Sequence, residues 1–93
     1  MRALKNLSLA CVATLPLSVV VAATAHAQAN CDWYAKTAVR QQQINETRKC
    51  GYTGQSWHKD LARHRAWCLV VPPDLWKAEA KKRSDLLMTC EKR

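Results

Sequence analysis

The sequence predicts an all-α fold: a small three-helix domain in up-down-up order, held by two disulfides, that follows a cleaved signal peptide. Three observations predict it. The first 29 residues have the composition of a targeting segment. Four cysteines follow with 18, 17 and 21 residues between neighbours, each near an end of a helix-like segment: Cys31, Cys50, Cys68 and Cys90. After residue 30, Gly and Pro occur only where one such segment gives way to the next.

The N-terminal segment has the parts of a secretory signal peptide. Arg2 and Lys5 form a charged start, residues 7–23 carry no charge, and small residues permit cleavage after Ala27 or after Ala29. An uncleaved membrane anchor is less favoured, because Pro16 interrupts the apolar run. We therefore expect residues 1–27 to be a signal peptide, residues 28–93 to form a single helical domain, and the mature protein to be periplasmic or secreted.

Removal of the signal leaves four cysteines and lowers the net charge from +8 to +6. An even number of cysteines in an oxidising compartment is typical of a disulfide framework. Small domains bury little apolar surface and often need such covalent links. The chain has no Phe, so we expect its four tryptophans to supply much of the core. They are Trp33, Trp57, Trp67 and Trp76.

The first helix is expected over residues 32–49, with Asn30 as its N-cap. This stretch has no Gly or Pro and is rich in Ala, Gln, Arg and Lys, which favour helix. Its apolar stripe is thin and fades at Gln41, and Gly51 stands where a helix C-terminal glycine is expected. The stripe consists of Cys31, Tyr34, Ala35, Ala38 and Val39.

The second helix is expected over residues 57–68, with Ser56 as its N-cap. Helical spacing puts four residues on one face, including a histidine that we expect to be partly buried: Trp57, Leu61, His64 and Cys68. Pro72-Pro73 prevents helix before it.

The third helix is expected from Pro73 or Asp74 to about Cys90, because proline and an acid both suit a first turn. Glu79 and Arg83 form an i,i+4 pair along it. Its predicted buried stripe is Trp76, Ala80, Arg83, Leu87 and Cys90.

Up-down-up topology predicts the disulfide pairing. Cys31 and Cys50 lie at opposite ends of the first helix, roughly 28 Å apart at 1.5 Å per residue. A disulfide requires Cα atoms within about 7 Å, so these two cannot pair. A Cys50–Cys68 link would have to span roughly 18 Å along the second helix. The pairs Cys31–Cys68 and Cys50–Cys90 remain.

The sequence predicts no enzyme, no catalytic residue, no cofactor and no metal. Zinc sites usually bring ligands in close pairs, whereas these four cysteines are far apart in the sequence and His58 and His64 point to different sides of a helix. An even cysteine count leaves no free thiol for catalysis. Phosphate-binding loops and nucleophile motifs are absent.

The basic surface predicts an anionic partner, namely an envelope component or an acidic protein. Export disfavours nucleic acid. The bases are spread over all three helices, so a merely solvated surface is the plain alternative. The predicted function is that of an exported, cationic, non-enzymatic binding or structural protein; the alternative is a membrane-active or toxin-like protein. The residues predicted to contact a partner are Arg63, Arg65, Trp67, Lys77, Lys81 and Lys82.

Several segments resemble a group of small proteins of alphaproteobacteria that carry a signal peptide and four cysteines. They are CDWYAKTA at 31–38, QQQ at 41–43, RKCG at 48–51, Trp-Cys at 67–68 and VPPD at 71–74. The resemblance covers the mature chain. It implies an exported four-cysteine helical domain and assigns no catalytic residue.

Overall fold

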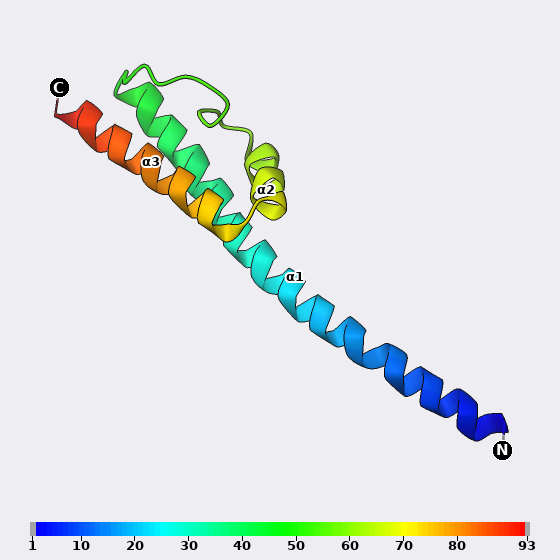
Figure 1. Ribbon diagram of the computed structural model, residues 1–93. Coiled ribbons are helices and arrows are strands. Elements are labelled where there is room, and N and C mark those ends of the chain that lie inside the picture. The colour runs from blue at the N-terminus through cyan, green and yellow to red at the C-terminus, as the bar shows by residue number, and fades with distance from the viewer. Residues whose placement is uncertain (1, 93) are drawn as a thin grey trace.

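A computed structural model describes the backbone of residues 2–92 and the side chains of residues 25–92. Over this range the chain forms three helices and no strand: α1 (Arg2–Thr47), α2 (Leu61–Val70) and α3 (Pro73–Glu91) (Figure 1). Two disulfides link them. The predicted class, an all-α three-helix fold with two disulfides, is confirmed.

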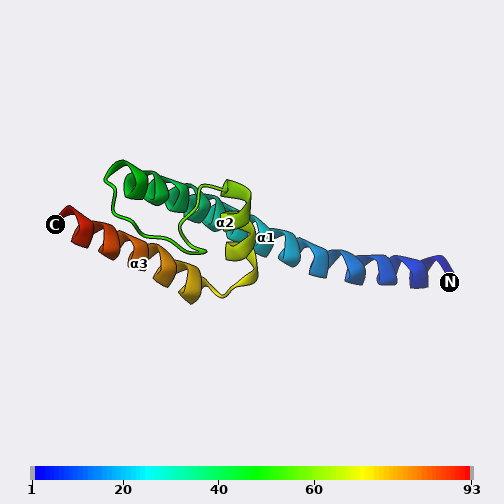
Figure 2. The ribbon, with the colours of Figure 1, turned by 90° about the horizontal axis from the view of Figure 1, so that it is seen from above.

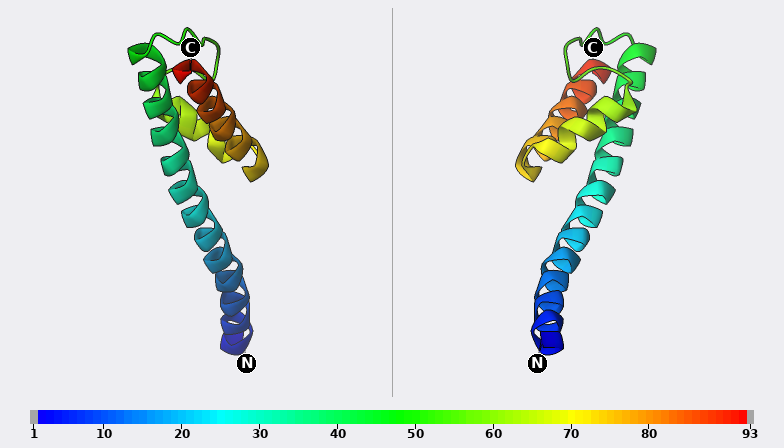
Figure 3. Two further views of the ribbon diagram at one scale, coloured as in Figure 1. Left: turned by 90° about the vertical axis from the view of Figure 1, so that its left-hand side faces the viewer. Right: turned by 90° about the vertical axis from the view of Figure 1, so that its right-hand side faces the viewer.

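Helix α1 is longer than the predicted first helix. It runs without a break from the N-terminal segment to Thr47, and its first half projects away from α2 and α3 (Figures 1 and 3). Asn30 lies inside this helix, so its prediction as an N-cap is wrong for the full chain, in which the preceding residues continue the helix. The helix ends two residues before the predicted boundary, where Lys49 takes a positive φ of 55° ahead of Gly51.

Helix α2 begins four residues later than predicted. Ser56 is not its N-cap; the Asp60 carboxylate caps it by accepting the Arg63 N–H at 3.1 Å. Trp57 lies before the helix, where its ring stacks on Tyr52 with centroids 5.1 Å apart. The expected face is therefore only half right: His64 and Cys68 are buried, but Leu61 is exposed.

Helix α3 follows the prediction closely. It starts at Pro73, and its buried residues are Trp76, Ala80, Arg83 and Leu87. Cys90 at the end of the same stripe is half-buried. The predicted Glu79–Arg83 pair is present, with Nη1 of Arg83 3.7 Å from Oε2 of Glu79.

Helices α1 and α3 run in the same direction, and the chain returns between them through residues 48–60 and α2 (Figures 1 and 3). Helix α2 crosses the other two obliquely, as the view from above shows (Figure 2). Both α2 and α3 pack mainly against α1. In the predicted up-down-up order, the segment that runs back between α1 and α3 is thus largely a loop and not a full-length helix.

The apolar core lies at the crossing of the three helices. Its buried members are Cys31, Tyr34, Ala38, Cys68, Trp76 and Ala80, and Val71 packs against them. Only one of the four tryptophans, Trp76, belongs to it, so the prediction that the tryptophans supply much of the core is wrong. Trp33 is 55% exposed, Trp67 is 37% exposed and Trp57 is half-buried beside Tyr52. On α1 small side chains take buried positions instead, since Ala35 and Ala38 are fully buried.

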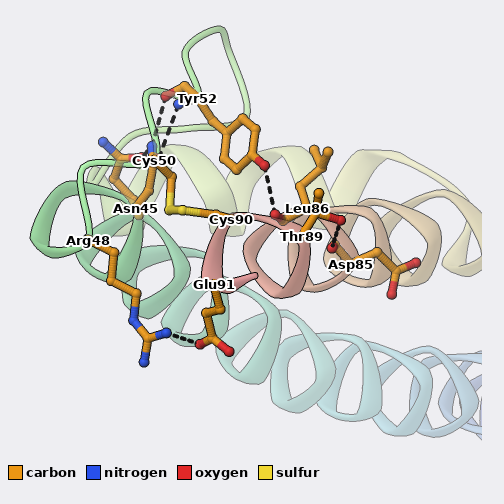
Figure 4. Close-up of a disulfide and its surroundings, with 10 residues drawn as sticks. Asn45, Arg48, Cys50, Tyr52, Asp85, Leu86, Thr89, Cys90 and Glu91 are labelled. Carbon is orange, nitrogen blue, oxygen red and sulfur yellow. Dashed lines mark hydrogen bonds and ion pairs between the residues drawn. A yellow bond between two sulfur atoms is a disulfide. The ribbon is translucent and has the colours of Figure 1, made fainter. Parts of the chain in front are cut away.

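The disulfides are Cys31–Cys68 and Cys50–Cys90, the two pairs that the sequence predicts. Their Cα atoms lie 5.5 Å and 5.6 Å apart, within the usual range. The first ties α1 to the end of α2, inside the apolar core. The second ties the segment after α1 to the end of α3 (Figure 4). Disulfides indicate an oxidising location outside the cytoplasm.

Candidate functional site

The six residues predicted to contact a partner remain accessible: five are exposed and Arg65 is half-buried. They are Arg63, Arg65 and Trp67 on α2, and Lys77, Lys81 and Lys82 on α3. They do not form one patch, because α2 and α3 are not antiparallel neighbours but pack separately on α1. Five of the six line three different hollows.

Arg63 and Trp67 line a half-open hollow of about 420 Å³, which we call the Arg63 hollow. Its other walls come from all parts of the domain. They are Tyr34 of α1, residues 55, 56 and 58 of the loop, His64 and Ala66 of α2, and Glu79 of α3. The hollow therefore exists only when the loop 48–60 is folded back over the helices.

Flat rings form much of the wall. Tyr34 lies with its ring centroid 5.6 Å from Trp67 and 6.1 Å from His64. His58 and His64 are stacked, with centroids 3.9 Å apart and planes inclined by only 7°. Such faces suit a flat, apolar ligand group.

The pKa values of both imidazoles of the stack are lowered, which favours the neutral rings at pH 7. Burial lowers the pKa of His64, and the nearby charges of Arg83 and Arg63 lower it further, against the opposing effect of its hydrogen bond to His58. Burial and the Arg63 charge also lower the pKa of His58. His64 Nε2 donates to the His58 carbonyl at 2.8 Å, and the Asp60 N–H donates to His58 Nδ1 at 3.2 Å. The neutral His58 ring therefore carries its proton on Nε2.

Arg63 is the one cation among the residues lining the Arg63 hollow, and between residues 25 and 92 it has no carboxylate partner. The nearest acid in sequence, Asp60, already accepts the Arg63 backbone N–H as the α2 cap. Glu79, the acid in the wall, pairs with Arg83. The Arg63 guanidinium is thus available to an incoming anion.

Arg83 lies behind this wall as a buried structural charge. Its Nε donates to Gln41 Oε1 at 2.7 Å, and Gln41 Nε2 donates to the Ala80 carbonyl at 3.0 Å. Its guanidinium carbon lies 5.1 Å from the centre of the Tyr34 ring. Burial raises the pKa of Tyr34, and the Arg83 charge opposes this. Within the described side chains Nη2 is the buried polar atom left without a hydrogen bond.

Lys77 and Lys81 line a second, more open hollow of about 530 Å³ between α1 and α3, which we call the Trp33 groove. Trp33 and Trp76 form its ring wall, with centroids 6.2 Å apart. Lys77 Nζ already lies 5.6 Å from the centre of the Trp76 ring. Lys81 already pairs with Asp85, at 2.7 Å between Nζ and Oδ2. Both lysines of the groove thus have partners within α3.

Lys82 lines a third hollow, of about 450 Å³, beside Trp57 and Arg83. Arg65 lines none of the three and pairs with Asp32, at 2.7 Å between Nε and Oδ1. Of the six predicted residues, the structure thus brings together only Arg63 with Trp67 and Lys77 with Lys81. In both cases the two residues are four positions apart on one helix.

The sequence reasoning missed Tyr34 and His58 as wall residues of the Arg63 hollow. Tyr34 was assigned to the core stripe, where it also belongs. His58 was placed inside the second helix, on a side away from His64, whereas it lies in the loop and stacks on His64. Asp60, an N-cap residue type directly before the apolar Leu61, is the sequence signal that places the helix start after His58.

Nowhere between residues 25 and 92 do three or more His, Cys, Asp or Glu side chains gather in a way that could hold a metal ion. Over the same residues no helix is long and apolar enough to cross a membrane. No family model, no curated protein and no solved structure matches this chain. The resemblance to four-cysteine proteins of alphaproteobacteria therefore stays a prediction.

Proposed function

We propose that the protein is a non-enzymatic binding protein of the periplasm or the extracellular medium, and that its partner is an anionic envelope component or an acidic protein. Two lines support export: the signal-like segment before Ala27 and the two disulfides, which form in oxidising compartments. The disulfides also leave no free thiol among the cysteines of the folded domain.

The observation that carries the proposal is the distribution of charge on the described side chains. Five acids take part in ion pairs: Asp32, Glu46, Glu79, Asp85 and Glu91. The two others, Asp60 and Asp74, lie at the N-terminal ends of α2 and α3. Against these two acids, seven exposed bases stay without an ion pair between residues 25 and 92: Lys36, Arg40, Lys49, Arg63, Lys77, Lys82 and Lys92.

A membrane-active protein is the rival, because several large apolar side chains are exposed. Val70 is 80% exposed, and Leu75 and Met88 are more than half exposed. A membrane-active helix needs these groups on one face. Leu75 and Met88 are thirteen positions apart on α3, which at about 100° per residue places them on different sides. The apolar groups are thus scattered, which favours the binding protein.

The test is co-sedimentation of the purified disulfide-bonded protein with envelope fragments. Binding should be strong at low salt and lost near 1 M salt, where the Debye length falls to about 3 Å. Lys77→Glu with Lys82→Glu should weaken it more than tenfold. Binding that is equal at both salt concentrations contradicts the proposal, and so does an unchanged double variant. Leakage of dye from anionic vesicles at micromolar protein would support the rival.

A further inference from the structure

We infer that the Arg63 hollow is a binding site for a small monocarboxylate that carries a flat ring. This inference rests on the proposed function, because it names the site and the chemical class of an anionic ligand. It goes further in separating one specific small-molecule site from the diffuse basic surface.

The shape of the hollow suits a small molecule. Its volume of about 420 Å³ falls within the range of roughly 300–1,000 Å³ that ligand sites span. It is half enclosed by three elements and the loop, whereas the Trp33 groove is more open and lies between two helices. A half-enclosed hollow removes more of a ligand's surface from water.

The walls select a ring. Four aromatic side chains line the hollow and contact one another in pairs: Tyr34 with Trp67, Tyr34 with His64, and His58 with His64, with ring centroids about 4 to 6 Å apart. Burial lowers the pKa values of both imidazoles, so at pH 7 these rings add no positive charge to the wall. A flat ring that enters the hollow meets aromatic side chains that already contact one another, so binding requires little ordering of the wall.

The polar groups select a carboxylate. The Arg63 guanidinium has no ion pair within the described residues and offers two parallel donors that match a carboxylate. His58, which also lines the hollow, adds an Nε2–H donor, since its Nδ1 accepts the Asp60 N–H. The charged guanidinium and the neutral imidazole together offer three N–H donors to the two oxygens of one carboxylate.

The wall also limits the charge of the ligand. Glu79 lines the hollow and keeps its own carboxylate on Arg83. A phosphate monoester or a polyanion would place its second charge near Glu79, with only Arg63 to neutralise it. Like charges at such short range raise the cost of binding. A single negative charge is therefore the best fit.

The four tryptophans allow a direct test, because each hollow contains its own reporter. Trp67 lines the Arg63 hollow, Trp33 and Trp76 line the Trp33 groove, and Trp57 lines the third. In ¹H–¹⁵N NMR spectra of the disulfide-bonded protein at pH 7, benzoate should shift the Trp67 indole N–H signal saturably. The Trp33 and Trp76 signals should move little. Trp67→Phe assigns the signal.

Two comparisons make the test decisive. Benzamide, which has the same ring and no charge, should bind at least about tenfold more weakly, because a hydrogen bond to a charged group is worth that factor or more. Arg63→Gln should weaken benzoate binding by a similar factor. Lys77→Gln removes an exposed base from the Trp33 groove and should leave the affinity unchanged.

Three results would overturn the inference: no saturable shift at millimolar benzoate, a shift centred on Trp33 and Trp76, or equal affinity of Arg63→Gln and the unsubstituted protein. Unchanged two-dimensional spectra outside the hollow show that Arg63→Gln remains folded. Salt-sensitive binding to envelope fragments together with no benzoate binding would leave the proposed function standing and remove only this site. Benzoate binding without binding to envelope fragments would leave this site standing and remove the proposed function.

Discussion

The two disulfides lie at opposite ends of the folded domain, and the ends are built in different ways. We call the Cys31–Cys68 end, with Tyr34, Ala38 and Trp76 around it, the packed end. We call the Cys50–Cys90 end, where polar groups of α1, the loop and α3 meet, the hydrogen-bonded end. At the packed end the disulfide is part of the apolar core. At the hydrogen-bonded end the disulfide lies outside that core.

Figure 4 shows the polar contacts of the hydrogen-bonded end. Asn45 holds the loop with two hydrogen bonds: its Nδ2 donates to the Tyr52 carbonyl at 2.8 Å, and its Oδ1 accepts the Tyr52 N–H at 3.1 Å. The Tyr52 hydroxyl donates to the Leu86 carbonyl at 2.7 Å. Arg48 pairs with Glu91. These contacts are specific in geometry but bury little apolar surface.

Removal of one disulfide at a time should show the largest difference in stability between the two ends. The bonds close loops of similar length, with sequence separations of 37 and 40, so the chain-entropy model gives roughly 4 kcal/mol for either. Cys31→Ala with Cys68→Ala should reach or exceed that loss, because it also opens the apolar core. Cys50→Ala with Cys90→Ala should cost less in global unfolding by urea, because that end can open alone.

Hydrogen exchange checks the same contrast residue by residue. In Cys50→Ala with Cys90→Ala, amides of residues 45–54 and 86–91 should lose protection while those near Trp76 keep it. In Cys31→Ala with Cys68→Ala, protection should fall along all three helices. Equal loss of protection in the two variants would remove the distinction between the ends.

Two tryptophans in ring contact provide the next largest effect. Trp76 is 8% exposed and belongs to the core, whereas its neighbour Trp33 is 55% exposed. Trp76→Ala should cost about 3–5 kcal/mol of unfolding free energy. Trp33→Ala should cost about 1 kcal/mol or less. Chemical denaturation measures both, and a Trp33→Ala loss as large as that of Trp76→Ala would contradict the position of the core.

Asn45 tests the hydrogen-bonded end alone. Asn45→Ala removes both hydrogen bonds to the part-buried Tyr52 backbone and should cost about 1–3 kcal/mol, because two hydrogen bonds that hold the loop on α1 are lost. Gln43→Ala, an exposed position two residues earlier on α1, should change stability by about 0.5 kcal/mol at most. Increased exchange confined to the loop 48–60 would show that the loss is local. Equal stabilities of the two variants would refute the role given to Asn45.

The sequence predicted some parts of the structure better than others, and the helices α3 and α2 show the difference. The prediction of helix α3, from Pro73 or Asp74 to about Cys90, is close to its bounds of Pro73–Glu91, since the prolines fix its start. Its predicted stripe is buried at Trp76, Ala80, Arg83 and Leu87. Helix α2 was misplaced because Ser56 and Asp60 are both good caps. The choice depends on Trp57 stacking on Tyr52, a contact that no helical period reveals.

Buried polar residues were the other failure. The α1 stripe was expected to fade at Gln41, yet Gln41 and Asn45 are buried and continue it. Gln41 is buried because its side-chain oxygen accepts a hydrogen bond from the buried Arg83, forty-two positions later. Contacts between residues far apart in the sequence also explain why the candidate site was only partly predicted. The Arg63–Trp67 spacing was readable on one helix, whereas Tyr34 and His58 join them only through the fold.

The smallest expected effect is a pH dependence at the packed end. In the unfolded chain His58 and His64 take up protons near the usual pKa of 6.5, whereas burial lowers both pKa values in the folded protein. Below about pH 6.5 the unfolded chain therefore binds more protons, so this part of the stability is present above pH 6.5 and is lost as the pH falls through the folded pKa values. Arg63 and Arg83 lower the pKa of both rings in the same direction.

Urea unfolding at pH 7.5 and pH 5.5 measures this loss, and His58→Gln with His64→Gln should reduce it. At the lower pH, protection of amides against exchange, taken relative to their intrinsic rates at that pH, should fall first in α2, which carries His64, and not near Asn45. A pH slope that persists unchanged in the double variant would show that the stack is not its source.

Peptide mapping under non-reducing conditions tests the central claim most directly: that the two ends of the folded domain are each closed by their own disulfide. The protein isolated from the periplasm or medium should yield linked peptides containing Cys31 with Cys68 and Cys50 with Cys90, and no free thiol in the mature chain. A Cys31–Cys50 or Cys50–Cys68 link, or free thiols at these positions, would contradict the account.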